Sequence, residues 1–390
     1  MKKTITFLSV LAVILLFLIS ACVQQSKQNV EQNKKTQTTQ LQGSYKIGVM
    51  FPLTGDAAIY GIPAQVSAKI AADEINAKGG VNGKKIEMIY EDSKCNPKDG
   101  NAAAQKLVNV DKVKVIIGGY CSGETLGAAP ITEANKVVLI SPSSSSPDIT
   151  KAGDFVFRLA PSDAFAGVVA SNYAFNDMKA RKAAIISETT DYAQGLRNIF
   201  KENFVKLGGE IVADETYNPD DADFRTQITK VKASAPDIIY VSPNTAIKSA
   251  ILIRQIREAG LKQKLLGNEV VIGAKNEMKE NAELWEDIIG VEQKFDDKAP
   301  KAAALFAKYK EQTSVEPALP QYMASAYDIV YLLSDAIVKY GYDSEKIRDY
   351  LYTVKAYDGA VGEITIDENG DPIMEYSVNQ VKSGDLVVLK

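Results

Sequence analysis

The sequence predicts an α/β fold of two doubly wound parallel-sheet lobes joined by a multi-strand hinge. From residue 45 onward, short apolar runs rich in β-branched residues alternate with segments of helical periodicity. This alternation is typical of parallel strands covered by helices on both faces. It occurs twice, with one series ending near Arg158 and a second starting at Ala183. The strands are too many for one compact sheet, so we expect two lobes.

In the first series, the apolar runs predict strands and the segments between them predict helices. The first helix carries apolar residues at 62, 66, 70 and 75 and ends at Gly79-Gly80, a typical helix stop. The expected strands are 46–50, 85–90, 113–118, 137–140 and 155–158, and the expected helices are 62–78, 101–111 and 125–135.

The second series repeats this order. Its expected strands are 183–187, 210–217, 237–241, 265–267 and 288–291, and its expected helices are 165–178, 195–207, 224–233 and 246–259. Strand-helix alternation of this kind gives right-handed crossovers and parallel sheets.

The last third of the chain is predicted to complete the two lobes rather than to form a third domain. Its expected helices are 299–312, 322–340 and 344–354, followed by antiparallel strands at 362–367, 375–381 and 386–389 with turns at Asn369-Gly370 and Ser383-Gly384. We therefore assign 44–162 and 293–365 to lobe 1, and 163–292 and 366–390 to lobe 2. The hinge is expected near 161–164, 290–293 and 365.

The first 21 residues predict a signal peptide. Lys2 and Lys3 precede an apolar stretch from 5 to 19, and small residues then lead to Cys22. The alternative is a membrane anchor, for which the stretch is short. Residues 19–22, ISAC, resemble the lipobox of bacterial lipoproteins, although leucine is commoner than isoleucine at position 19. The resemblance implies cleavage before Cys22 and lipidation of its thiol.

Residues 22–43 predict a disordered tether. They contain almost no large apolar side chains and cannot bury a core. As a flexible chain the tether reaches about 25 Å. We therefore expect an exported protein, held by lipidated Cys22 at the outer face of the cell membrane or in the periplasm.

The cysteine count predicts one disulfide. Of three cysteines, lipidation of Cys22 leaves an even pair, Cys95 and Cys121. In an oxidising compartment such a pair is expected to form a disulfide, worth about 3 kcal/mol of stability. The alternative is two unrelated buried thiols.

Composition excludes several classes of function. The chain of 390 residues has no histidine, which excludes Ser-His-Asp catalysis and histidine-ligated metals. The net charge is −4, and no dense Lys/Arg cluster indicates a nucleic-acid surface. We expect no metal, no cofactor and no nucleic-acid partner, and a monomer.

The loops that follow strands are the expected place for a ligand, because parallel sheets bind ligands beyond the carboxyl ends of their strands. In the first series these loops offer Tyr60 in FPLTGDAAIYG and Ser122 in GYCSGETLGAA. A third, SPSSSSP at 141–147, has the composition of a linker but directly follows a buried strand. Its hydroxyls can donate to or accept from a polar ligand.

In the second series, the same loops offer Tyr192, Asn244 and Glu269. Taken alone, the carboxylate of Glu269 is better explained by a helix cap or a solvated position than by a ligand site. Taken together, one lobe supplies hydroxyls and helix N-termini that suit an anion. The other supplies a carboxylate and an aromatic ring, which suit an ammonium and an apolar tail. An α-amino acid has all three parts.

From Tyr45 to about residue 380 the chain resembles the branched-chain amino-acid-binding proteins of ABC importers. These are the Leu/Ile/Val class of type I periplasmic binding proteins, with a Venus-flytrap fold. The motifs that carry the resemblance are IGVMFPLTGDAAIYG, EINAKGGVNGKKIEMIYEDSKCNP, AAAQKLVNVDKVKVIIGGYCSGETLGAAP, LISPSSSSPDIT, VFRLAPSD, DYAQGL, DFRTQITKVKASAPDIIYV and IRQIREAGLK.

The resemblance implies residue roles. Ser122 would hold the ligand carboxylate, the Ser143 carbonyl would accept from the ammonium, and Ser145 would contact both charged groups. Ser144 lies in the same segment. Glu269 would pair with the ammonium. Tyr60, Tyr192 and Tyr322 would surround the cleft, and the family's disulfide matches Cys95 and Cys121.

The chain departs from the family at two places. Ser143 and Ser144 replace small apolar residues, and Asn244 falls near a position that is often aromatic. Both changes predict a more polar pocket, so a polar amino acid or an amide is an alternative to leucine, isoleucine or valine. Glu269 favours a cationic amine.

The expected function is capture of an amino acid in the cleft between the lobes and delivery to a membrane permease, without catalysis. A ligand-sensing receptor for amino acids or amides is the alternative. A lipoprotein amidase is a third possibility, which the absence of histidine and of a lysine–serine motif disfavours.

Overall fold

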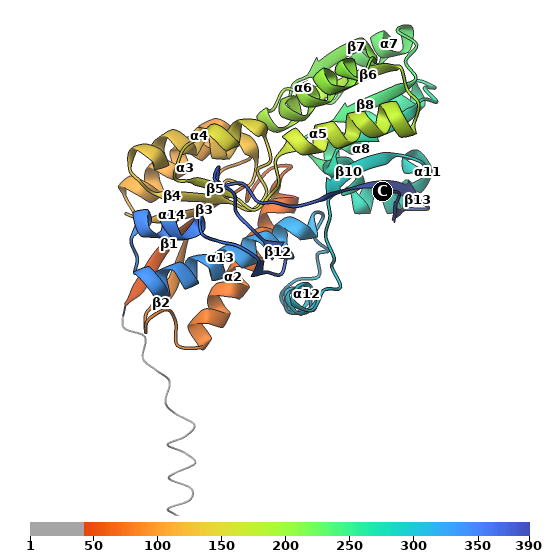
Figure 1. Ribbon diagram of the computed structural model, residues 1–390. Coiled ribbons are helices and arrows are strands. Elements are labelled where there is room, and N and C mark those ends of the chain that lie inside the picture. The colour runs from red at the N-terminus through yellow and green to blue at the C-terminus, as the bar shows by residue number, and fades with distance from the viewer. Residues whose placement is uncertain (1–42) are drawn as a thin grey trace, which may run out of the picture. The chain divides into compact units, whose positions relative to one another are not determined.

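The computed structural model describes residues 43–390, which form two lobes, each built on its own sheet (Figure 1). The predicted signal peptide, Cys22 and nearly all of the predicted tether lie outside the described residues. In residues 43–390, no helix combines the length and the apolar character needed to span a bilayer.

Lobe 1 contains a five-stranded sheet in the order β2-β1-β3-β4-β5. All of its pairings are parallel, as predicted. The strands are β1 (Ser44–Phe51), β2 (Lys85–Asp92), β3 (Val115–Gly118), β4 (Val138–Ser141) and β5 (Val156–Arg158). The helices of this segment are α2 (Ala58–Ala77), α3 (Pro97–Asn109), α4 (Ser122–Ala134) and the 3₁₀ turn η1 (Pro147–Lys151).

Lobe 2 contains a seven-stranded sheet in the order β14-β13-β10-β9-β8-β6-β7. Five strands are parallel, and the last two strands of the chain add to one edge in antiparallel fashion. They are β6 (Lys182–Glu188), β7 (Glu210–Tyr217), β8 (Ile238–Ser242), β9 (Lys264–Gly267), β10 (Ile289–Gln293), β13 (Tyr376–Lys382) and β14 (Asp385–Val388).

The helices of lobe 2 cover both faces of its sheet. Four were predicted and are present: α5 (Asp163–Asn172), α6 (Asp191–Lys206), α7 (Arg225–Ala233) and α8 (Ala246–Glu258). The predicted helix 165–178 is wrong in its second half, where the chain forms a π-helical turn, η2 (Tyr173–Asp177). Three short helices were not predicted: α9 (Glu269–Ile272), α10 (Lys275–Glu280) and α11 (Ala282–Trp285).

The last third of the chain returns to both lobes. Helices α12 (Pro300–Gln312), α13 (Pro320–Tyr340) and α14 (Ser344–Leu351) belong to lobe 1, where α12 and α13 pack against α2. The strand predicted at 362–367 is wrong in length, because β12 covers only Glu363–Ile364, which pairs with Tyr357–Asp358 (β11). Ile366 forms only an isolated bridge with Pro372.

Alternating strand residues feed the apolar layers on the two faces of each sheet, as the pleat requires. In β6, Ala183 and Ile185 join the cluster under α5 and α6. Ala184 and Ile186 join the cluster formed with α7 and α8. Both faces of the strand are therefore buried, which explains its continuous apolar sequence.

The strand order places a switch point in each lobe. In lobe 1, the crossovers leave β1 and β3 in opposite directions, and in lobe 2 they leave β6 and β8 in the same way. Ligands of doubly wound sheets bind at such points, beyond the carboxyl ends of the strands. The loops after these four strands are therefore the place to examine.

The chain passes between the lobes three times, at 159–162, 294–299 and 365–375 (Figure 1). The first and third crossings are tied together, because the Tyr376 hydroxyl donates to the carbonyls of Pro161 and Ser162, both at 3.0 Å. Three crossings restrict the relative motion of the lobes more than one linker would.

Candidate ligand-binding site

A small cavity of about 40 Å³ lies where the loops after the switch-point strands of the two lobes meet. The lining residues from lobe 1 are Tyr60, Tyr120, Cys121, Ser122, Ser143, Leu319 and Tyr322, and those from lobe 2 are Tyr192, Asn244, Glu269 and Val270. A neighbouring cavity of about 370 Å³ shares several of these residues. The smaller cavity therefore continues toward the surface.

Seven of the nine residues predicted for the ligand site line this cavity: Tyr60, Ser122, Ser143, Tyr192, Asn244, Glu269 and Tyr322. The side chains of Ser144 and Ser145 do not. The assignment of all nine to ligand binding stays a prediction, and the cavity places seven of them around one volume.

The lobe 1 side of the cavity contains the N-terminus of α4. Ser122 is the first residue of this helix and is 1% exposed. Its Oγ accepts a hydrogen bond from the Ser146 N–H at 3.1 Å, so its own O–H remains available to donate. A helix N-terminus with a free hydroxyl donor suits an anionic group.

The serine-rich loop between β4 and η1 is fixed by its own hydroxyls. Ser143 Oγ donates to the Tyr120 carbonyl at 2.6 Å. Ser144 Oγ lies 2.7 Å from Thr125 Oγ1 and 3.0 Å from the Gly119 carbonyl oxygen. These hydroxyls are bonded to the neighbouring loop, so they add less polarity to the cavity than the sequence suggests.

Ser145 is bonded to the start of lobe 2. Its Oγ donates to Asp163 Oδ2 at 2.8 Å, and its carbonyl accepts from the Asp163 N–H at 2.8 Å. Asp163 is 1% exposed. Burial raises the pKa of the Asp163 carboxyl well above its usual value, and the nearby charge of Glu269 raises it further.

A buried ion pair joins this loop to the third crossing. Arg158 is fully buried and donates to Asp371 through Nε at 2.6 Å and Nη2 at 2.7 Å. Its Nη1 donates to the Ser146 carbonyl at 2.8 Å. The bidentate geometry fixes both segments relative to β5.

The lobe 2 side of the cavity contains a buried carboxylate. Glu269, the first residue of α9, is 4% exposed. Burial raises the pKa of its carboxyl, while its own backbone N–H and the hydroxyls of Tyr192 and Tyr322 lower it by a smaller amount. The Tyr322 hydroxyl donates to Oε1 at 3.4 Å. A buried carboxylate with no lysine or arginine partner in residues 43–274 and 277–390 suits a ligand that supplies a cation.

The Tyr192 hydroxyl is buried and has no hydrogen-bond partner of ordinary length in the described part of the chain. It nevertheless lies near enough to Glu269 to affect the pKa of that carboxyl. Buried polar atoms are normally satisfied, so a loose hydroxyl at the edge of this cavity is a candidate contact for a ligand.

Tyrosine rings form one wall of the cavity. The rings of Tyr60 and Tyr120 are stacked with centroids 6.1 Å apart, and Tyr322 meets Tyr120 edge-on at 6.4 Å. The Tyr60 hydroxyl also accepts from the backbone N–H of Ala246, the first residue of α8, at 2.8 Å. This hydrogen bond connects the two lobes beside the cavity.

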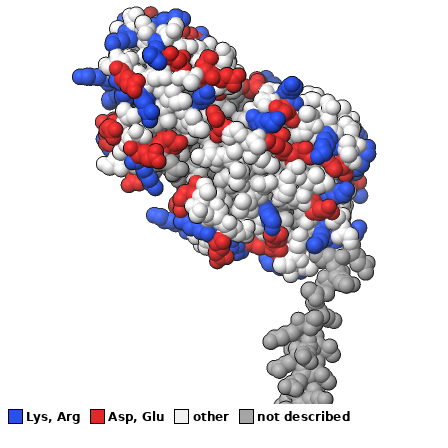
Figure 2. Space-filling model, turned by 180° about the vertical axis from the view of Figure 1, so that it is seen from behind, with Lys and Arg blue, Asp and Glu red and all other residues white. Residues whose placement is uncertain are grey.

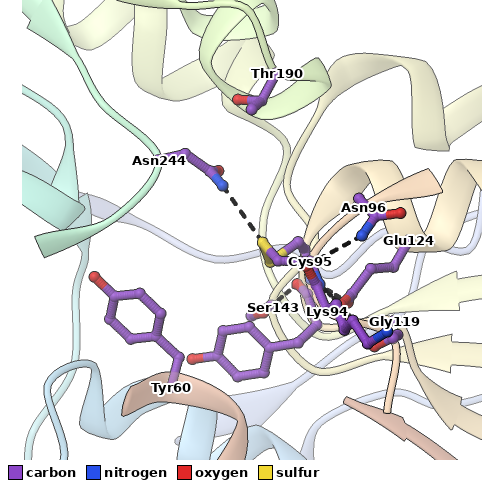
Figure 3. The surroundings of a disulfide bond; sticks show 12 residues. Tyr60, Lys94, Cys95, Asn96, Gly119, Glu124, Ser143, Thr190 and Asn244 are labelled. Carbon is purple, nitrogen blue, oxygen red and sulfur yellow. Dashed lines mark hydrogen bonds between the residues drawn. A yellow bond between two sulfur atoms is a disulfide. The ribbon is translucent and has the colours of Figure 1, made fainter. Parts of the chain in front are cut away.

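The predicted disulfide is confirmed: Cys95 and Cys121 are joined, with Cα atoms 5.2 Å apart. It lies at the cavity, opposite Asn244 of lobe 2, whose Nδ2 lies 3.4 Å from Cys95 Sγ (Figure 3). The Asn244 N–H donates to the buried carboxylate of Glu188 at 2.9 Å. Asn244 is therefore fixed from both of its ends.

The sequence reasoning missed several residues at this site. Tyr120, Val270 and Leu319 line the cavity, and Asp163 and Glu188 are buried carboxylates beside it. Tyr120 and Val270 are immediate neighbours of predicted positions, so position after a strand could have indicated them. No sequence pattern indicates Leu319, which comes before a helix far along the chain.

Charged side chains of both signs are interspersed on the face seen in Figure 2. The site is instead defined by buried groups, with hydroxyls and helix termini on one lobe and Glu269 on the other. Such an arrangement presents a partner for each of the two opposite charges of a small zwitterion.

Comparison with known proteins gives consistent matches. The sequence profile of the periplasmic binding protein family matches residues 44–385. An amino acid binding protein of Pseudomonas aeruginosa is 35% identical over 227 residues, covering 58% of this chain and 60% of that protein. Leu/Ile/Val-binding protein homolog 1 of Brucella abortus is 31% identical over 330 residues, covering 84% and 87%.

A solved structure is also similar. The branched-chain amino acid transporter substrate binding protein LivJ of Streptococcus pneumoniae, in complex with isoleucine, is 30% identical with a TM-score of 0.78. The match covers 89% of this chain and 99% of that one.

Proposed function

Since the chain belongs to the periplasmic binding protein family, we propose that it binds an α-amino acid between its lobes and delivers it to the permease of an ABC importer. One observation carries the proposal: Ser122 at the N-terminus of α4 and the buried Glu269 line one cavity from different lobes. A zwitterion pairs with both at once, and the protein catalyses no reaction.

The roles of the other residues follow from this placement. The ligand carboxylate contacts Ser122 and the α4 N-terminus, and the ammonium contacts Glu269 and the Ser143 carbonyl. Ser145 and Ser144 act by holding the loop rather than by lining the cavity. The tyrosine wall and Val270 take the ligand side chain.

A branched-chain ligand has the most support. The names of the relatives from Brucella abortus and Streptococcus pneumoniae refer to leucine, isoleucine, valine or branched-chain amino acids. The hydroxyls of Ser143 and Ser144 are bonded to protein carbonyls, which weakens the argument for a polar ligand. Asn244 remains the residue that would favour a more polar side chain.

The cellular setting belongs to the same proposal. The family is one of exported binding proteins, and the sequence of residues 1–22 supports a signal peptide with lipidation at Cys22. A tether over 22–43 would let the monomeric body reach the permease. Lobe 1 comprises 44–162 and 293–365, and lobe 2 comprises 163–292 and 366–390, an assignment supported by the strands in each sheet.

Thermal shift with leucine, isoleucine, valine, polar amino acids and amino-acid amides tests the proposal. A ligand at 100 times its Kd adds about 2.7 kcal/mol to the free energy of unfolding, so the melting temperature should rise clearly. A rise with branched-chain amino acids alone supports the favoured ligand. If no amino acid raises the melting temperature, the proposal fails.

A further inference from the structure

A buried carboxylate, Glu124, lies in the first turn of α4, behind the cavity wall and beside the disulfide (Figure 3). Its Oε1 accepts from Ser93 Oγ and from the Cys95 N–H, both at 2.6 Å. Its Oε2 accepts from the Cys121 N–H at 2.8 Å. One side chain thus holds the backbone of both disulfide partners.

Glu124 forms no ion pair with a lysine or arginine in the described side chains, those of residues 43–274 and 277–390. Burial raises the pKa of its carboxyl to about 7, so its charge is costly. All three of its partners are donors, which only a carboxylate can accept together, since an amide would turn its NH₂ toward one of them. Gly119 leaves room for it, because a Cβ there would lie 2.4 Å from Glu124 Cβ.

The first turn of α4 connects Glu124 to the rest of the cavity wall. Ser122 and Thr125, on either side of it, are hydrogen-bonded to the serine-rich loop at Ser146 and Ser144. In the other direction, Cys95 contacts Asn244 of lobe 2. A shift of the Glu124 carboxylate would therefore displace the N-terminus of α4, the serine-rich loop and the contact between Cys95 and Asn244.

We propose that Glu124 is a positioning residue for the amino-acid site: it fixes the α4 N-terminus and the disulfide loop in the geometry that binds ligand. It does not touch the ligand itself. The inference rests on the proposed function and assigns a second, non-covalent restraint to the segment that the disulfide already holds.

Asp328 provides a matched control. It is a buried carboxylate of lobe 1 that accepts the backbone N–H groups of Ala360 and Val361, both at 2.8 Å. Its pKa is also raised, to about 7, by burial. It belongs to α13 and lines neither the cavity nor its neighbour. Its replacement should lower stability without disturbing the site.

The test compares wild type, Glu124→Gln, Glu124→Asp and Asp328→Asn by isothermal titration with L-leucine, L-isoleucine and L-valine, well below the melting temperature of every variant. Glu124→Gln should weaken binding about tenfold, and Glu124→Asp should recover part of this loss by returning an acceptor for the N–H groups. Asp328→Asn should bind the amino acids with wild-type affinity, even if its melting temperature is as low as that of Glu124→Gln.

A double-mutant cycle with Cys95→Ala/Cys121→Ala adds a second measurement. Because both restraints hold one loop, the cost of Glu124→Gln should be larger without the disulfide. Wild-type affinity in Glu124→Gln, or an equal loss in Asp328→Asn, overturns the positioning role while leaving the amino-acid function intact. If wild type binds none of the three amino acids, the proposed branched-chain function itself fails, and the inference with it.

Discussion

In the proposed site, Glu269 is the residue that most directly recognises the positive charge of the ligand. It is buried, it forms no ion pair with a lysine or arginine in residues 43–274 and 277–390, and two tyrosine hydroxyls lie near it. Removing the charge from a buried partner of a cation typically costs a few kcal/mol. Glu269→Gln should therefore weaken amino-acid binding roughly 100-fold, or about 3 kcal/mol, in a calorimetric titration.

Although Glu269→Gln should weaken ligand binding, the same substitution should make the unliganded protein more stable. Burial raises the pKa of Glu269 in the folded protein, so its contribution to stability is present below the unfolded pKa and is lost as pH rises through the folded pKa. At pH 8, where the buried carboxylate must carry its charge, Glu269→Gln should therefore have a higher melting temperature than wild type. A variant that melts lower at pH 8 would contradict this account of the carboxylate.

Single residues also mark the limit of sequence reasoning. Glu269 and Ser122 could be predicted as cavity residues, because each lies in a loop that follows a predicted strand. The side-chain directions of Ser143, Ser144 and Ser145 could not, because a run of identical residues carries no periodicity. Their hydroxyls donate hydrogen bonds to backbone carbonyls and to Asp163, which come from other parts of the chain.

At the scale of elements, several helices begin earlier than their apolar periodicity predicts. Helix α3 begins at Pro97 instead of 101, and α6 begins at Asp191 instead of 195. In each, a cap extends the helix through a polar first turn: Asn96 accepts from the Asp99 N–H, and Thr190 from the Ala193 N–H. Apolar spacing alone cannot detect these turns.

Helix α6 approaches the serine-rich loop through a glycine. A Cβ at position 195 would lie 2.8 Å from Pro147 Cδ, so lobe 2 meets lobe 1 here without a side chain between them. Gly195→Ala should push the lobes apart at this contact and weaken ligand binding by several-fold, measured by titration, with a larger radius of gyration in X-ray scattering.

Gly127→Ala is the matched control for this prediction. The tight contacts of a Cβ at this position are with Pro97 of α3 in lobe 1, the shortest at 2.3 Å from its carbonyl oxygen. This variant should lower the melting temperature without changing the scattering. Equal effects of the two substitutions on the radius of gyration would refute the role of Gly195.

At the scale of the whole molecule, the repeated strand-helix order was enough to predict two lobes, and the motifs were enough to predict their family. The crossings were harder to place. The third spans 365–375, where a strand was expected and where Asp371 pairs with Arg158. Its course depends on this distant ion pair and not on local propensity.

The pH dependence of overall stability offers a further prediction. The folded pKa of Asp328 is raised to about 7 by burial, so its stabilising contribution is complete at low pH and is lost as pH rises toward 7. The stability difference between wild type and Asp328→Asn should therefore shrink by about 2 kcal/mol between pH 5 and pH 8. Urea unfolding at both values measures it, and a difference that grows with pH would contradict the assignment.

The hydrogen bond from Ala246 to Tyr60 has a kinetic consequence. It joins the lobes beside the cavity without involving any ligand atom. This bond must break whenever the lobes separate beside the cavity, so the rate constant of a release that needs such an opening includes the cost of breaking it. Tyr60→Phe should increase the dissociation rate constant of the ligand more than it changes the association rate constant, as stopped-flow binding would measure. For a carrier that must release its cargo at the membrane, this bond therefore helps to set the delivery interval.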